Sequence, residues 1–238
     1  MTQVVTLATC GVLFFFICEN DSKLSMAGIK VTTIIKESNP FSAFLSSRKF
    51  MTMLLFILFC IVVMQNLGNT AFDQSFNYFL KDQFNFSSGY NGAIKAAMGF
   101  ITLIANSTVT VWILNKTGVN KSIIWVFCAG FAMMLIAILS SSMPIPFIGA
   151  NVVFYAFAAT SLPLLQNMVA KSAVGENSNL IMGLYNSMKS LGGIIGALVA
   201  GFLYNIAPIL PFYFGLLSYL FAFILAILYY RKSKSSNV

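Results

Sequence analysis

The chain has 238 residues, of which 58% are hydrophobic and only 8% are charged, whereas soluble domains carry about 25% charged residues. This composition excludes an ordinary water-soluble protein. The formal net charge of +8 is compatible with binding to nucleic acid or to an acidic membrane surface, so the placement of the cations along the chain must distinguish the two.

Apolar segments follow one another along the chain, and each is close to the length of about 20 residues that crosses a hydrocarbon core. The sequence therefore predicts an all-α polytopic membrane helix bundle. The predicted spans are residues 1–18, 50–72, 91–114, 122–142, 145–168, 179–203 and 207–230.

The lysines and arginines are distributed asymmetrically between the connections. Only Lys81 lies in a connection on the opposite side, and Lys95 and Lys189 fall inside spans. By the positive-inside rule, the connection 19–49 and the C-terminal tail are expected in the cytoplasm. We therefore expect a multi-pass protein of the cell membrane whose partner is the lipid bilayer and not nucleic acid. The cations on the cytoplasmic side are Lys23, Lys30, Lys36, Arg48, Lys49, Lys116, Lys121, Lys171, Arg231, Lys232 and Lys234.

The spacing of the spans predicts four parts. A first helix at 1–18 is joined by a cytoplasmic linker, 19–49, to a six-helix domain at 50–230, and 231–238 form a cytoplasmic tail. With the tail inside, residue 1 would lie outside, so we interpret the first helix as the last one of a preceding half.

Within the domain, short connections divide the helices as three plus three, as in the inverted repeats of secondary transporters. The connection at 73–90 is predicted to be a long polar loop on the outer side.

Enzymatic chemistry is not expected. The chain has no histidine, the commonest general base, and it shows no nucleophile–base pair, metal-ligand cluster or phosphate-binding loop. The cysteines lie at spacings that fit neither a zinc site nor a disulfide framework. We therefore predict no catalytic residues, no metal and no cofactor.

Three stretches resemble the C-terminal half of a major facilitator superfamily transporter. Residues 154–205 carry a late proline, then a G-x-x-x-S and a glycine series, in FYAFAATSLPLLQNMVAKSAVGENSNLIMGLYNSMKSLGGIIGALVAGFLYN. They resemble the tenth and eleventh helices of bacterial drug/proton antiporters. Residues 96–122 look like the eighth helix followed by a degenerate copy of the basic cytoplasmic loop, and NPFSAFLSSRKF resembles the end of the central loop.

The resemblance implies a fragment of a secondary active transporter, an antiporter for drug efflux. It would export small hydrophobic or cationic compounds in exchange for protons by alternating access, with a missing N-terminal six-helix half as partner. That half is expected to hold the proton-coupling carboxylates. In this chain the loop motif is carried by Asn115, Lys116, Gly118 and Lys121, without the acidic residue of the family pattern.

Two alternatives remain open. The same fold could take up a sugar or an organic acid, although an uptake protein would more often carry charged or amide-rich clusters at mid-membrane. A non-transporting or dimerising half-size membrane protein is the other alternative.

Lys189 is the most unusual residue of the sixth predicted span. It lies about ten residues from the cytoplasmic end, which at 1.5 Å per residue is roughly 15 Å deep. A lysine at that depth costs about 2.5–3.5 kcal/mol and therefore usually faces a bundle interior or water. It shares a helix face with Tyr185 and Asn186, which predicts a cavity lining, and extension of the lysine to the interface is the alternative.

Small residues at helical spacing in the same span predict close helix packing. These residues are Gly183, Ser187, Gly192, Gly193, Gly196, Ala200 and Gly201.

Polar side chains on three other spans are the remaining candidates for a substrate cavity. Lys95 is expected to extend to the outer interface. Asp73 is expected at the outer end of its helix, with a proton-binding role as the alternative. The predicted cavity residues of these spans are Gln65, Asn69, Asp73, Thr102, Asn106, Asn151 and Tyr155.

Overall fold

The computed structural model describes residues 51–116, 118–173 and 178–236, which all belong to one compact unit. Six helical segments of this part are long and apolar enough to cross a membrane, which confirms the predicted all-α bundle. The expected first helix, 1–18, and the linker, 19–49, lie outside the described residues.

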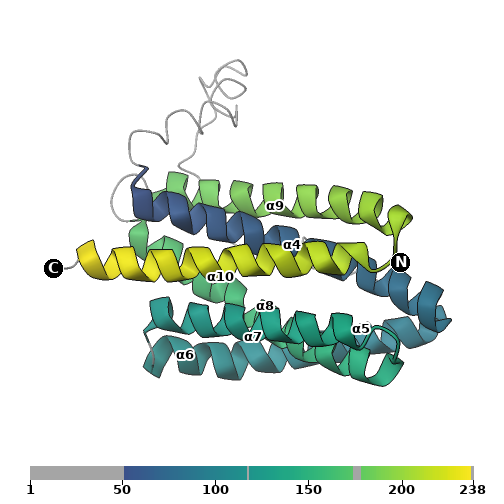
Figure 1. The fold of residues 1–238 in the computed structure, drawn as a ribbon. Helices are drawn as coiled ribbons and strands as arrows, with labels where there is room; N and C mark the ends of the chain where they lie inside the picture. Colours follow the sequence, from purple (N-terminus) through teal and green to yellow (C-terminus); the bar gives the residue numbers. More distant parts are fainter. Residues whose placement is uncertain (1–50, 117, 174–177, 237–238) are drawn as a thin grey trace, which may run out of the picture. The chain divides into compact units, whose positions relative to one another are not determined.

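The helices follow the predicted order of spans (Figure 1). Their connections at 85–87, 140–143 and 207–209 lie at one end of the bundle, which we call the distal end. The helices are α4 (Met53–Phe84), α5 (Ser88–Ala105), η1 (Asn106–Thr110), α6 (Val111–Lys116), α7 (Val119–Leu139), α8 (Pro144–Ser172), α9 (Ser178–Ile206) and α10 (Leu210–Ser236).

Helix α4 differs most from its prediction. The prediction of a polar loop at 73–90 is wrong, because the helix continues to Phe84. The polar residues of this stretch hide an apolar face at helical spacing, formed by the buried side chains of Phe76, Phe79 and Leu80. The helix ends where Asn85 adopts a left-handed conformation (φ 54°) and the Phe86 N–H donates to the Leu80 carbonyl at 3.1 Å, a common C-terminal cap.

The third span is one continuous helical segment with a π-helical turn, η1, between α5 and α6. A π-helix is defined by backbone hydrogen bonds between residues five apart, and here the Thr110 hydroxyl also donates to the Ala105 carbonyl at 3.4 Å. Around this turn Asn106 is exposed and Thr110 is buried.

Helix packing has the pattern of two three-helix repeats. The first repeat runs from α4 to α7, with α5, η1 and α6 as one span, and the second runs from α8 to α10. The first helix of the first repeat, α4, packs on α9 and α10, and the first helix of the second, α8, packs on α5 and α7. In Figure 1, α9, α4 and α10 accordingly lie side by side, as do the helices from α5 to α8. Each repeat therefore places its first helix against the second and third helices of the other.

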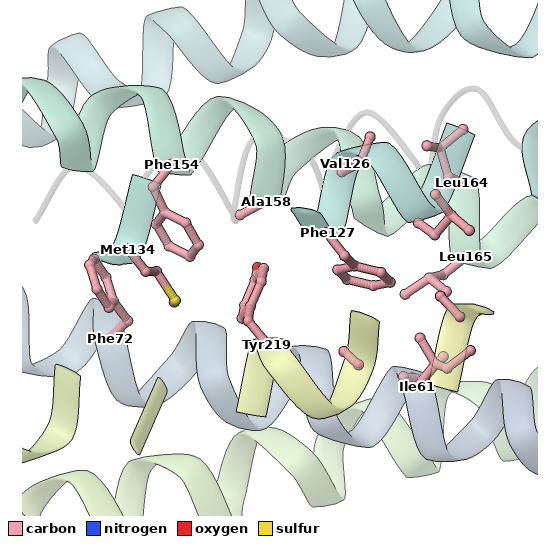
Figure 2. Packing of buried hydrophobic residues seen from close by; sticks show 14 of the residues in the cluster. Ile61, Phe72, Val126, Phe127, Met134, Phe154, Ala158, Leu164, Leu165 and Tyr219 are labelled. Carbon is pink, nitrogen blue, oxygen red and sulfur yellow. The ribbon is translucent and has the colours of Figure 1, made fainter. Parts of the chain in front are cut away.

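Tyr219 of α10 is the side chain that joins these groups in the core (Figure 2). Its ring, 1% exposed, lies 5.2 Å from the Phe154 ring of α8 and 5.9 Å from the Phe127 ring of α7, measured between centroids. A Cβ atom at Gly68 of α4 would come within 3.0 Å of this ring, and one at Gly130 of α7 within 3.1 Å. Both glycines thus make room for the tyrosine.

Helices α4 and α9 touch backbone to backbone. A Cβ atom at Gly192 would lie 2.5 Å from the Val63 carbonyl oxygen, and one at Gly196 would lie 2.5 Å from that of Leu67. Ala200, one turn further along, is also buried. The described helices do not pack against Gly183, Ser187 or Gly201, which are exposed.

The close contact between α4 and α9 makes the structure sensitive to a single methyl group. We expect Gly196→Ala to lower the midpoint of thermal unfolding of the purified protein in detergent, because overpacking costs about 1–3 kcal/mol. The matched control is Gly183→Ala, where a Cβ meets nothing within 4 Å and alanine favours the helix by about 0.8–1 kcal/mol. An equal response of the two variants would contradict the close contact.

Candidate functional site

Three spanning helices contribute one polar side chain each to a cluster inside the bundle. Asp73 of α4 forms an ion pair with Lys95 of α5 and accepts a hydrogen bond from the Tyr155 hydroxyl of α8. The Lys95 ammonium also donates to the Tyr155 oxygen at 3.2 Å. The three groups are therefore mutually bonded, and we call them the Asp73 cluster.

The Asp73 cluster lies well away from the helix ends. At 1.5 Å per residue, Lys95 is about 10 Å from the start of α5, and Tyr155 is about 16 Å from the start of α8. Helix α4 likewise extends eleven residues beyond Asp73. The expected position of Asp73 at a helix end is therefore wrong.

The surroundings of Lys95 explain how its charge is held there. Its ammonium nitrogen lies 4.8 Å from the ring centroid of Tyr155 and 5.4 Å from that of Phe76, distances at which an aromatic ring attracts a cation. The side chains of Lys95 and Asp73 remain 29% and 41% exposed. The Lys95 ammonium, which was expected to extend to the outer interface, binds Asp73 and remains partly accessible.

A second polar contact joins α4 and α8 nearer the end of the bundle that lies opposite the distal end. The Gln65 side-chain amide donates to the Ser161 hydroxyl at 3.1 Å, and both residues are fully buried. The Gln65 amide oxygen accepts in turn from the Asn66 side chain at 2.8 Å. The α4–α8 contact is thus polar at two levels.

Two asparagines add hydrogen-bond acceptors next to the cluster. Asn69 precedes Asp73 by one turn of α4, and Asn151 precedes Tyr155 by one turn of α8. The side-chain oxygens of both are buried, and within the described residues they accept no hydrogen bond. Buried polar groups are almost always paired, so these oxygens are available to a polar group that enters between the helices.

The other predicted cavity residues lie apart from the cluster. Tyr185 is buried, Asn186 is exposed and Lys189 is half-buried on α9, and no hydrogen bond or ion pair described for the chain joins them to Asp73. On the third span, Thr102 donates to the Gly99 carbonyl and Asn106 accepts from Thr110. Both contacts are local.

The predicted loop motif lies at the end opposite the distal one. Asn115 and Lys116 close α6, Gly118 precedes the first residue of α7, and Lys121 lies in the first turn of α7. Among the side chains that the structure describes, Lys121 of this loop forms no ion pair.

The ion pair should be measurable as a coupling energy. Lys95→Met leaves the Asp73 carboxylate without its partner, and removing one partner of a fully buried pair costs about 3–5 kcal/mol. Because both side chains are partly exposed, we expect a smaller loss of unfolding free energy, about 1–2 kcal/mol. The double variant Asp73→Asn/Lys95→Met should be more stable than Lys95→Met alone, as a double-mutant cycle of thermal unfolding would show. Additive effects would argue against the pair.

Comparison with known proteins identifies the family. The sequence model of the Major Facilitator Superfamily matches residues 58–238, and no curated protein matches the sequence. Among solved structures, the chain is similar to a bacterial homologue of the iron transporter ferroportin in its outward-facing state, with a TM-score of 0.57 and 18% identity. The match covers 77% of this chain and 47% of that protein, so the chain spans about half the length of its structural relative. On the family match and the six-helix architecture together, the chain belongs to the Major Facilitator Superfamily.

Proposed function

We propose that the chain is part of a proton-coupled transporter of the cell membrane that exports small hydrophobic or cationic compounds by alternating access. Its partner in this proposal is an N-terminal six-helix half of the same fold, which supplies the other wall of the pathway. The described helices supply one wall, with α4 and α8 as its central members. The pathway would run between the two halves.

The Asp73 cluster carries this proposal. A charged side chain inside a membrane-spanning helix is costly and, where it occurs, usually marks a substrate or ion pathway. Here a carboxylate, an ammonium and a hydroxyl come from three different helices, and the side chains of Asp73 and Lys95 keep part of their surface accessible. A purely structural contact would not require accessible charge.

The bonding within the cluster supports a simple exchange step. When Asp73 is ionised, its carboxylate accepts from both Lys95 and Tyr155 and ties α4, α5 and α8 together. Protonation of Asp73 removes the charge that Lys95 is paired with and weakens both contacts. A cationic substrate competes with Lys95 and with the proton for the same carboxylate, so the occupancy of the site by one excludes the other.

Transport in proteoliposomes tests the exchange step. With the intact transporter, Asp73→Asn should reduce ethidium movement driven by a pH gradient to the level of empty liposomes, because the site can no longer take up and release a proton. Counterflow of labelled ethidium should slow as well, because the cation loses the carboxylate for which it competes with the proton. The initial rates of both processes are the measurement.

Asn77→Ser is the matched control for Asp73→Asn, since Asn77 lies one turn along the same helix with an exposed side chain. It should transport as the unmodified protein does. Gradient-driven transport that survives in Asp73→Asn would overturn the coupling role. Accumulation of a sugar or an organic acid in place of ethidium would favour the alternative function, an uptake transporter.

Topology is tested separately. We expect the distal end outside the cell and Val238 in the cytoplasm, because the basic connections lie at the opposite end of the bundle. A green fluorescent protein fused after Val238 should fluoresce, and alkaline phosphatase at the same position should be inactive. Fusions placed between Ser140 and Met143 should give the reverse result, and active phosphatase at the C-terminus would contradict this orientation.

A further inference from the structure

A cleft separates α4 from α9 toward the distal end of the bundle. The two helices touch at Gly192 and Gly196, and their ribbons draw apart toward the distal end (Figure 1). The resulting cleft has a volume of about 630 Å³, within the range of sites that hold drug-sized molecules. Small residues of α9, namely Ala197, Ala200 and Gly201, line one wall.

An acid and two aromatic rings lie together in this cleft. Tyr204 of α9 donates its hydroxyl to Asp82 of α4 at 3.1 Å, so the two walls are bridged. The Tyr78 and Tyr204 rings lie 5.9 Å apart between centroids, tilted by 51°. Tyr78 is 60% exposed, which leaves much of its surface accessible to a ligand.

The charge of Asp82 has no cationic partner among the described residues. Its neighbour in sequence, Lys81, is exposed and forms no ion pair there. One oxygen of the carboxylate accepts from Tyr204, which leaves the other available. A carboxylate beside two aromatic rings is the combination that attracts an organic cation, through charge and through the negative ring faces.

The cleft is separate from the Asp73 cluster. Nine residues separate Asp82 from Asp73, and at about 100° per residue the two carboxylates lie on opposite faces of α4. The Asp73 side faces α5 and α8, and the Asp82 side faces α9. A ligand in the cleft would not touch Lys95 or Tyr155.

We propose that the distal α4–α9 cleft is a second binding site, specific for a small organic cation with apolar substituents. Asp82 supplies the charge, Tyr78 and Tyr204 supply ring faces, and the small residues of α9 supply the space. The proposal extends the proposed function and rests on it for the membrane setting. A binding measurement nevertheless tests it without transport.

Binding is measured by equilibrium dialysis of the purified full chain in detergent, with methyltriphenylphosphonium as the cation and triphenylphosphine oxide as a neutral compound of similar shape. We expect saturable binding of the cation and not of the neutral compound. Asp82→Asn should lower the affinity for the cation by about tenfold or more, as expected when a contact to a charged group is lost. Equal binding of both compounds, or unchanged affinity in Asp82→Asn, would overturn the proposal.

Further variants separate the roles of ring and space. Tyr78→Phe should retain affinity, Tyr78→Leu should lose part of it, and Tyr213→Leu, at an exposed tyrosine outside the cleft, is the matched control. If Asp82→Asn does not fold, Gly201→Leu tests the site instead. A Cβ at this position meets nothing within 4 Å, so the leucine side chain should fill the cleft while Asp82 remains, and cation binding should be lost. Binding that survives Gly201→Leu would place the cation elsewhere.

The two proposals fail in different ways. Loss of cation binding in Asp82→Asn together with normal proton-driven transport in Asp73→Asn would remove the coupling role and leave the cleft site intact. Normal cation affinity in Asp82→Asn with abolished transport in Asp73→Asn would do the opposite.

Discussion

The bundle depends on how closely other helices approach the backbone of α4. On one side Gly192 and Gly196 of α9 rest against the carbonyls of Val63 and Leu67, and on another Gly68 lies against α10 at Gly215 and Ser218. Between helices in a membrane, hydrophobic burial from water contributes little, and van der Waals contact takes its place. Glycines at the points of contact are therefore what permits α4 to occupy the middle of three packed helices.

This central position gives α4 two polar faces with different environments. One face meets α5 and α8 and carries an acid whose charge is balanced by Lys95. The other faces α9 and carries an acid bonded to a tyrosine hydroxyl. Because the two acids are nine residues apart on one helix, its periodicity keeps them on opposite faces of α4. The glycine contacts decide which neighbouring helix each face meets.

Much of the architecture was predictable because it depends on the lipid environment. Hydropathy and length located the six described spans. The small-residue spacing included the buried Gly192, Gly196 and Ala200 of the α4 contact, but also Gly183, Ser187 and Gly201, which are exposed. The extension of α4 was missed because Asp73, Asn77, Lys81 and Asp82 suggested a loop, although the phenylalanines between them keep helical spacing. Asn85, a residue that tolerates a left-handed conformation, was the signal that could have located the helix end.

The contacts within the Asp73 cluster could not be predicted from the sequence in the same way. Asp73, Lys95 and Tyr155 were each visible, but their spacings of 22 and 60 residues carry no information on contact. Which helices meet is decided by the exchange of partners between the two repeats, and no residue-level repeat in the sequence indicates that exchange. The distal cleft was missed for a related reason, because it exists only where two helices diverge.

The π-helical turn at Asn106–Thr110 has a consequence for comparing this protein with its relatives. A π-turn behaves as a single extra residue within an α-helix, and it rotates everything after it by about 100° relative to what came before. A relative that lacks the extra residue would align with this chain without any visible gap in hydropathy. Its residues after the turn would nevertheless point in a different direction, so positions 111–116 can be equated between sequences only once the turn has been accounted for.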